Sequence, residues 1–310
     1  MLYATLRQDV TTGLARVAEH SPALPPEAEL QSLWFGGAFG RDFATTDGRP
    51  VRIVQFGEWN HGAGPDFLHS VVEIDGTTAK GPLELDPRAA DWENHGHAVN
   101  PAFDEVVLHV VFATGRAAHF TRTSQGREVP QVAIPAELLD EALDHPLHAR
   151  ADSREGRCAP PLAELPASRV EEILAEAARF RIQRKARQLQ RLEDSHGPEE
   201  AFWQSLARAL GYGPNKLAMT LLGQRVPRRA LRDLRTTLQR EALLFGRAGF
   251  LSPDIHNRAP VDSRRYLEGL WREWWKIRPG RELEDPRRLP WARGGVRPGN
   301  HPHRRLGALA

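Results

Sequence analysis

Four segments in the first half of the chain have the density of apolar and β-branched residues that is typical of β-strands. The second and third of them flank Asp75-Gly76, a residue pair that favours a tight hairpin turn. The pattern therefore predicts a strand hairpin with one further strand on each side. The predicted strands are residues 49–57, 67–75, 80–86 and 105–113.

Polar and apolar residues alternate along the third predicted strand. Successive strand residues point to opposite faces, so Leu83 and Leu85 share one face. Lys80, Glu84 and Asp86 share the other face. We expect the leucines to join the core and the charged residues to line any functional site on the opposite face.

Two short helical patterns, at residues 28–37 and 87–97, complete the order α-β-β-β-α-β. Residues 116–150 predict a further strand pair and a short helix. This order predicts an α/β (α+β) fold in which helices flank a mixed sheet.

The second half of the chain is predicted to be all helical. Residues 168–194 keep helical periodicity, and Ser168 and Glu171 have the spacing of a capping box. A tryptophan cluster at 270–275 is expected to pack the last helices together. Because composition changes in a proline-rich junction, we place an α/β domain at 1–157 and a basic helical domain at 158–310. The other predicted helices are 199–210, 214–222 and 227–245.

Composition excludes several classes of protein. The single cysteine, Cys158, excludes an internal disulfide framework and fits a reducing compartment. No apolar run approaches the roughly 18 residues of a membrane span, and the first residues lack a signal-peptide pattern. The chain also lacks the glycine-rich motifs of nucleotide hydrolysis and hydride transfer. We expect a cytoplasmic protein without a membrane partner.

The net charge of +2 conceals two halves of opposite sign. Residues 1–150 carry a net charge of −10, and the rest of the chain carries +12, almost all of it from arginine. Arginine suits phosphate recognition, so nucleic acid is the expected partner of the basic half. An ordinary solvated helix surface, or a partner for the acidic half, is the alternative interpretation.

Two carboxylates are predicted to meet in the sheet. Asp66 stands at the entrance of the second strand, and Glu84 lies in the middle of the third, 18 residues later. Carboxylate oxygens suit a hard cation such as Mg²⁺, with Mn²⁺ as a substitute, and such an ion acidifies bound water. The sequence thus predicts a magnesium site on Asp66 and Glu84.

These residues resemble the motif of the PD-(D/E)XK nuclease superfamily, in which Pro-Asp on one strand is followed by Glu-X-Lys on the next. Pro65-Asp66 and Glu84-Leu85-Asp86 are similar, but Asp86 stands where the lysine belongs. The resemblance implies a metal-dependent nuclease in which Asp66, Glu84, Asp86 and His95 are catalytic. Lys80 is on the same face but lies four residues, roughly 13 Å of strand, from Glu84, so an outlying residue such as His95 is the expected substitute.

Nearly the whole chain resembles DUF 2851, a bacterial family of unknown function. Members often carry Glu-X-His where this chain has Glu84-Leu85-Asp86, so the chain departs from this pattern too. The resemblance implies a site around Asp66 and Glu84, without an established activity. The similar motifs include Asn60, Gly64-Pro65-Asp66-Phe67, Asp91-Trp92, His95-Gly96-His97, Leu108-His109-Val110-Val111, Asn215-Lys216 and Arg297-Pro298.

Three histidines offer a different metal site. His95 and His97 diverge on a continuous helix, so they meet only if the helix ends between them, which Gly96 permits. With His109 they would supply the three ligands of a catalytic zinc. The alternative is that His95 or His97 closes over the carboxylates and His109 is a buried structural residue. Glu58 and Asn60 are expected to support the site from the preceding loop.

Two groups of basic residues are the predicted nucleic-acid contacts. Three arginines at 228, 232 and 235 are expected to share one face of a helix. The predicted contacts are Arg181, Arg184, Lys185, Arg187, Arg228, Arg232 and Arg235.

The sequence leaves three functions open: a Mg²⁺-dependent nuclease, an inactive nucleic-acid-binding or scaffold protein on the same fold, and a zinc hydrolase.

Overall fold

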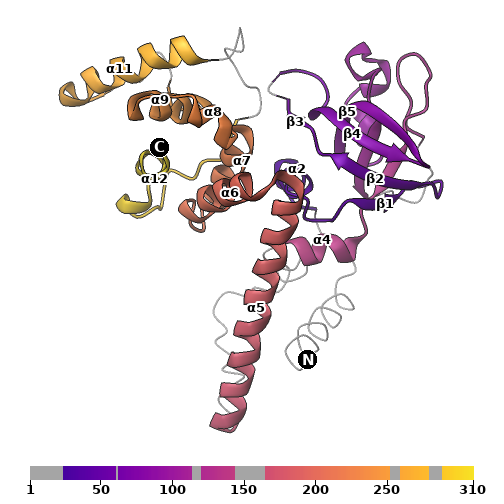
Figure 1. Ribbon diagram of the computed structural model, residues 1–310, viewed down its shortest axis with the longest axis horizontal. Helices are drawn as coiled ribbons and strands as arrows, with labels where there is room; N and C mark the ends of the chain where they lie inside the picture. Colours follow the sequence, from indigo (N-terminus) through magenta and orange to yellow (C-terminus); the bar gives the residue numbers. More distant parts are fainter. Residues whose placement is uncertain (1–23, 61, 114–119, 144–164, 252–258, 279–287) are drawn as a thin grey trace.

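A mixed seven-stranded sheet forms the first part of the computed structural model (Figure 1). The structure describes residues 24–60, 62–113, 120–143, 165–251, 259–278 and 288–310. The strand order is β1-β2-β4-β5-β6-β7, with β3 paired to β4. β1, β2, β4 and β5 pair antiparallel, whereas β5, β6 and β7 pair parallel. The strands are β1 (Asp42–Ala44), β2 (Pro50–Gln55), β3 (Glu58–Trp59), β4 (Phe67–Ile74), β5 (Thr77–Arg88), β6 (Leu108–Ala113) and β7 (Gln131–Ala133).

The sheet curls until it is nearly a barrel. Thr45, directly after β1, forms a bridge with Val132 of β7. The amide of Thr46 donates to the carbonyl of Gln131 at 2.8 Å. The two ends of the strand order therefore meet.

The hairpin predicted at Asp75-Gly76 is confirmed. Both residues have positive φ, 49° and 75°, as a tight turn with right-handed strand twist requires. β4 and β5 pair from Ile74 opposite Thr77 onward, so β5 begins three residues before the predicted strand.

The two faces of β5 differ as predicted, since one carries apolar side chains and the other carries acidic side chains. Leu83 and Leu85 are fully buried in the main core, which α2 (Glu27–Phe35) covers through Leu30 and Trp34. Glu84 and Asp86 point to the opposite face, where a separate small cluster is built around Trp92 and Phe103. This second face carries the candidate site.

The helix predicted at residues 87–97 is much shorter in the structure. β5 continues to Arg88 because it pairs with β6 as far as Ala113. Only α3 (Asp91–Asn94) is α-helical, and Gly96 then reverses the chain at a φ of 75°. The strand predicted from residue 105 begins at Leu108, where pairing with β5 starts, and 3-10 turns at His97–Val99 and Pro101–Phe103 lie before it.

The predicted short helix in residues 116–150 is α4 (Ala136–Ala142). In place of the predicted strand pair, the structure has β7 and an isolated bridge between Arg122 and Glu128. Residues 114–119 and 144–150 of this segment lie outside the described residues.

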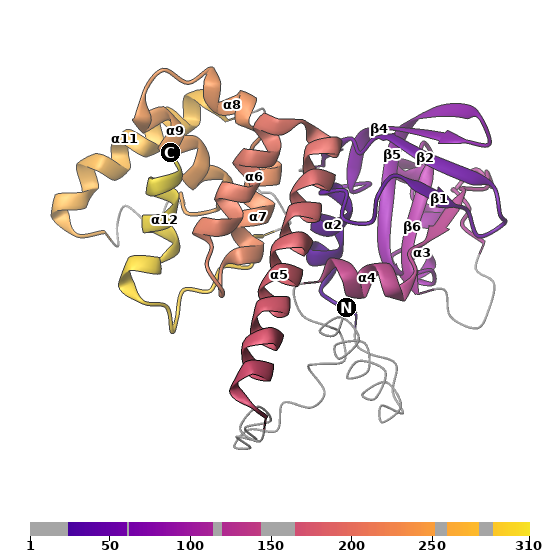
Figure 2. The ribbon, with the colours of Figure 1, turned by 60° about the horizontal axis from the view of Figure 1, so that its bottom comes forward.

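The rest of the described chain is helical, as predicted. α5 forms a long rod whose first turns extend beyond the body of the molecule, and the later helices gather on its far side from the sheet (Figures 1 and 2). The helices are α5 (Ala167–His196), α6 (Pro198–Leu210), α7 (Lys216–Arg225), α8 (Arg228–Arg232), α9 (Thr237–Arg247), α11 (Val261–Ile277) and α12 (Pro302–Leu309).

The helix predicted at 168–194 is confirmed as α5, but its capping box was wrong, and so was the single helix predicted at 227–245. α5 begins at Ala167 with Pro166 as its N-cap, so Ser168 lies inside the helix and forms no cap. The helix predicted at 227–245 is two helices, α8 and α9. It breaks because Thr236 is extended and forms a capping box with Gln239, which starts a new helix.

Side chains join the helices to the sheet half. The ring of His196, at the end of α5, stacks on Phe35 with centroids 4.5 Å apart. The guanidinium of Arg225 lies 5.1 Å from the ring of Trp59, and Gln224 Nε2 donates to the carbonyl of Ser32 at 3.0 Å. One hydrophobic core runs from α2 to α12. The predicted boundary at residue 157 lies outside the described residues.

Within the described ranges, no helix combines the length and the apolar character that a membrane span requires.

A matched pair of glycines tests the packing of the last helices. A Cβ on Gly246 of α9 would lie 2.4 Å from the ring of Trp274 in α11, whereas one on Gly269 would meet only Leu238 at 3.5 Å. Overpacking costs about 1–3 kcal/mol, and alanine gains up to about 1 kcal/mol in helix propensity. We expect Gly246→Ala to lower the free energy of unfolding in urea and Gly269→Ala to leave it unchanged or raise it. Equal effects of the two substitutions would contradict this packing.

Candidate active site

The structure brings Asp66 and Glu84 together. Phe67 of β4 pairs with Leu83 of β5, so the residues next to them, Asp66 and Glu84, are neighbours across the two strands. The amide of Asp66 donates to Glu84 Oε2 at 2.9 Å, and the amide of Leu85 donates to Asp66 Oδ2 at 3.2 Å. Both side chains are buried. Backbone donors therefore fix the orientation of the two carboxylates.

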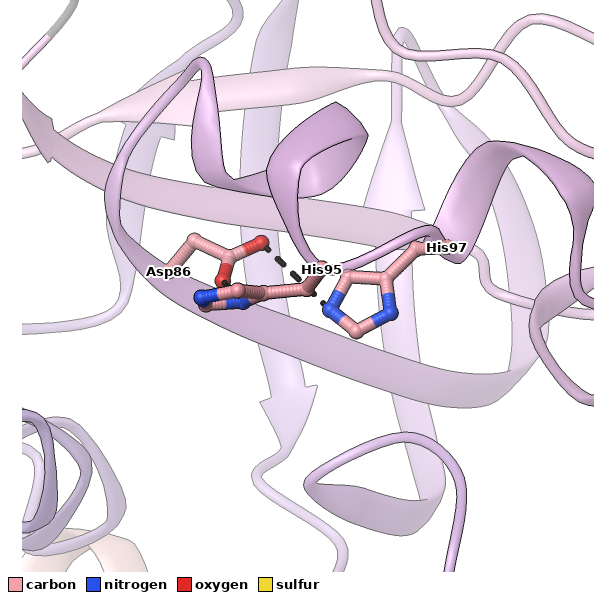
Figure 3. Close-up of side chains that lie close together, drawn as sticks. All are labelled: Asp86, His95 and His97. Atoms are coloured by element: carbon pink, nitrogen blue, oxygen red, sulfur yellow. Dashed lines mark hydrogen bonds and ion pairs between the residues drawn. The ribbon is translucent and has the colours of Figure 1, made fainter.

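Asp86, two residues further along β5, is surrounded by histidines. Its Oδ1 lies 3.0 Å from His95 Nδ1, and its Oδ2 lies 3.2 Å from His109 Nε2. His97 Nε2 is 3.9 Å from the same Oδ2. Potential ligand atoms of Asp86, His95 and His97 all lie within 4.8 Å of one another (Figure 3).

His97 is held by ring stacking rather than by hydrogen bonds to its side chain. Its ring stacks on Phe103 with centroids 3.9 Å apart and packs edge-on against Trp92. Nε2 is 3.2 Å from Glu84 Oε1, which satisfies the distance of an ion pair but not the direction of a hydrogen bond. This buried nitrogen has no hydrogen-bond partner among the described residues. It faces the carboxylates of Glu84 and Asp86.

His109 lies behind Asp86 in a fully buried polar chain. Gln131 Nε2 donates to Thr121 Oγ1 at 3.1 Å, and Thr121 Oγ1 lies 2.9 Å from His109 Nδ1. Gln131 Nε2, which is only a donor, also lies 3.3 Å from Nδ1, so Nδ1 is the acceptor and Nε2–H donates to Asp86. The chain fixes the tautomer of His109 and the orientation of Asp86.

Burial lowers the pKa of the two inner histidines, His97 and His109. It lowers the pKa of His97 below its ordinary value of 6.5, against the opposing effect of the Asp86 and Asp66 carboxylates. Burial also lowers the pKa of His109, although its hydrogen bond to Asp86 acts in the opposite direction. Both rings are therefore held in the neutral form, in which imidazole can bind a metal ion.

Of three residues predicted to support the site, two lie at exposed positions of strands, and one shapes the loop before Asp66. Lys80 is exposed on β5 and opposite Val71. Glu58 forms an exposed ion pair with Arg229 of α8 at 2.7 Å. Asn60 shapes the loop before Asp66. Its side-chain Nδ2 donates to the carbonyl of Pro65 at 2.8 Å, and its backbone amide donates to the carbonyl of Asp66.

The predicted basic contacts are spread over several elements. Arg181, Lys185 and Arg187 are exposed on α5, whereas Arg184 is half-buried. The expectation that residues 228, 232 and 235 share one helix face was wrong. α8 ends at Arg232, which pairs with Glu199 of α6, and Arg235 lies in the connection to α9.

Sequence reasoning missed three members of the site: Phe103, Thr121 and Gln131. Gln131 stands opposite His109, and His109 opposite Glu84, so these polar residues form a row across β7, β6 and β5. Isolated polar residues in predicted strands were the available signal, but their spacing along the chain did not reveal the row.

The fold and site define a mixed α+β protein with three carboxylates and three histidines gathered on one face of its sheet. The chain belongs to the family described as protein of unknown function DUF2851, whose model matches residues 27–310. Comparisons with curated proteins and with solved structures gave no match.

The lowered pKa of His109 predicts the sign of a pH effect on stability. The unfolded chain binds a proton near the ordinary value of 6.5, and the folded protein resists it. Stability should therefore fall as the pH drops below about 6.5. Urea unfolding at pH 7.5 and 5.5 should show a smaller loss for His109→Asn than for wild type, whatever the variant's stability at pH 7.5. An equal loss in both proteins would contradict the assignment.

Proposed function

We propose that this protein is a metal-dependent nuclease that hydrolyses phosphodiester bonds in DNA or RNA. The observation that carries the proposal is the buried pair of Asp66 and Glu84, set side by side directly before β4 and in the middle of β5. Their carboxylates are held by backbone amides, so the site is organised before any ligand binds.

The order of elements supports this proposal. α2, β2, β4, β5, α3 and β6 follow the α-β-β-β-α-β order that the PD-(D/E)XK resemblance implies, with β1, β3 and the 3-10 turns as additions. The aspartate and the glutamate stand on the second and third of these strands, as that resemblance also implies. Asp86 replaces the lysine and is engaged by His95 and His109.

A hard cation, Mg²⁺ or Mn²⁺, fits the oxygen ligands of Asp66 and Glu84. Such an ion, when bound, would acidify a water molecule and stabilise charge on the phosphate. The protein's own contribution is to fix the two carboxylates and to place His95, whose side chain is 45% exposed, at the open side of the site. A substrate phosphate can therefore approach past His95.

Nucleic acid is the proposed partner of the basic half. Exposed basic residues on α5 and around α8 would contact backbone phosphates without reading sequence. They include Arg181, Lys185, Arg187, Arg228 and Arg235. The replacement of lysine by Asp86 favours one alternative, a protein that binds nucleic acid on this fold but does not cleave it.

Cleavage of a labelled panel of DNA and RNA tests the proposed function. Wild type should cut in Mg²⁺ or Mn²⁺ and stop when a chelator is added. Asp66→Asn and Glu84→Gln should lower the cleavage rate by at least about 100-fold, because even indirect partners of a metal ion are worth about 10–100-fold. Glu93→Gln is the matched control, since it removes the same charge from an exposed position of α3.

The cleavage assay separates the two candidate functions. Cleavage that survives both substitutions would refute the assignment of the site. Salt-sensitive binding without cleavage by wild type would favour the inactive nucleic-acid-binding protein.

Salt dependence tests the basic surface of α5. The triple substitution Arg181→Ala, Lys185→Ala and Arg187→Ala should weaken binding to DNA or RNA of any sequence. The slope of log Kd against log salt should decrease by about 2–3, since each lost phosphate contact contributes about 0.7–0.9. Arg52→Ala, at an exposed position of β2, is the control. An unchanged slope in the triple variant would mean that the phosphate contacts lie elsewhere.

A further inference from the structure

We propose that Asp86, His95 and His97 form a binding site for a divalent transition-metal ion, with Zn²⁺ as the type ion. Two imidazole nitrogens and one carboxylate oxygen are the ligand set that such ions prefer, whereas Mg²⁺ favours oxygen alone. Three protein ligands with an open position are also the arrangement of a catalytic zinc. This site is separate in its ligands from the Asp66–Glu84 pair.

The distances between ligand atoms fit a metal ion. Tetrahedral ligands about 2.0–2.1 Å from zinc lie about 3.3 Å from one another. His95 Nδ1 is 3.0 Å from Asp86 Oδ1, and His97 Nε2 is 3.9 Å from Asp86 Oδ2. One ligand atom from each of the three residues lies within 4.8 Å of the other two, so side-chain rotation has to close the widest of these gaps to about 3.3 Å for all three atoms to reach one ion. Glu84 Oε1, 3.2 Å from His97 Nε2, stands at the edge of this group.

The local backbone explains why the two histidines converge. His95 caps the C-terminus of α3, and Gly96 adopts a left-handed conformation with a φ of 75°. The chain turns back there, so His97 begins a 3-10 turn and its ring comes to lie 5.4 Å from that of His95. Two histidines that would diverge on a continuous helix thus face the same carboxylate.

Outer hydrogen bonds fix the proposed ligands in place. His109 donates to Asp86 Oδ2, and Thr121 and Gln131 hold His109 in turn. Stacking on Phe103 restrains the His97 ring. Partners of this kind, directly behind the ligands, are what metal sites use to set ligand orientation.

The balance of buried charge also points to a cation. The carboxylate of Asp86 is 1% exposed. Burying ionised carboxylates is costly unless positive charge compensates them. The charged partners of Asp86 among the described residues are histidines, and His97 Nε2 is buried without a hydrogen bond while it faces two carboxylates. A bound dication would compensate the Asp86 carboxylate and use that nitrogen as a ligand.

The proposed ion also accounts for the missing lysine. Where the PD-(D/E)XK motif places a positive charge two residues after the glutamate, this chain places Asp86. A dication on Asp86 restores positive charge at that position and would acidify a bound water. This role in cleavage rests on the proposed function, whereas occupancy of the site does not.

Direct metal binding tests the proposal without any assay of cleavage. Protein stripped with a chelator is titrated with Zn²⁺ in competition with a chromophoric chelator, and with Co²⁺ followed by visible absorption. We expect one equivalent of Zn²⁺ per chain and Co²⁺ bands typical of nitrogen and oxygen ligands. Asp86→Asn, His95→Gln and His97→Gln should each weaken Zn²⁺ binding by at least about 10-fold.

His69→Asn serves as the control, because it removes an exposed histidine of β4 at a φ of 59°, which asparagine tolerates. Far-UV circular dichroism confirms that each variant is folded. His95→Gln is the decisive variant, because the imidazole of His95 is half-exposed and its removal leaves the core intact.

The outcomes distinguish this inference from the proposed function. Zinc that binds wild type, and is lost in the three variants but not in His69→Asn, supports the site even if no nucleic acid is cut. Absence of stoichiometric zinc, or zinc binding that survives His95→Gln and His97→Gln, overturns the inference. Cleavage in Mg²⁺ that depends on Glu84 would in that case leave the proposed function standing.

Discussion

The pairing of β4 with β5 is the constraint on which both the core and the site depend. The tight turn at Asp75-Gly76 fixes the register of this pair, and a shift of one residue would exchange the two faces of β5. In the observed register Leu83 and Leu85 enter the core, and Glu84 lies beside Asp66. Hydrophobic burial on one face therefore holds the carboxylates in position on the other.

The opposite face of the sheet combines polar groups with an unusual degree of burial. Trp92 and Phe103 form a small apolar cover on this side, and they exclude water from Asp86 and His109. A low-dielectric environment strengthens each hydrogen bond of the chain from Gln131 to Asp86. The same environment makes a buried carboxylate costly unless it is hydrogen-bonded, as Asp86 is to His109.

Much of this arrangement could be predicted because it follows from local rules. Alternation along β5 and the hairpin at Asp75-Gly76 predict the faces of the strand and bring Asp66 close to Glu84. The break at Thr236 could not be predicted from periodicity, because the apolar pattern continues while a capping box starts a new helix. The approach of Gln131 to His109 depends on the parallel pairing of β6 with β7, which are separate segments of the sequence. Short-range patterns contain no information about such pairing.

The near closure of the sheet limits how this protein can associate with others. An open edge strand offers unpaired backbone groups to which an extended peptide can add as a further strand. Here β1 and β7 are three residues long each, and the bridge from Thr45 to Val132 joins the two ends of the strand order. Strand addition is therefore disfavoured along these edges. A partner would therefore have to be recognised at these edges by side chains rather than by strand pairing.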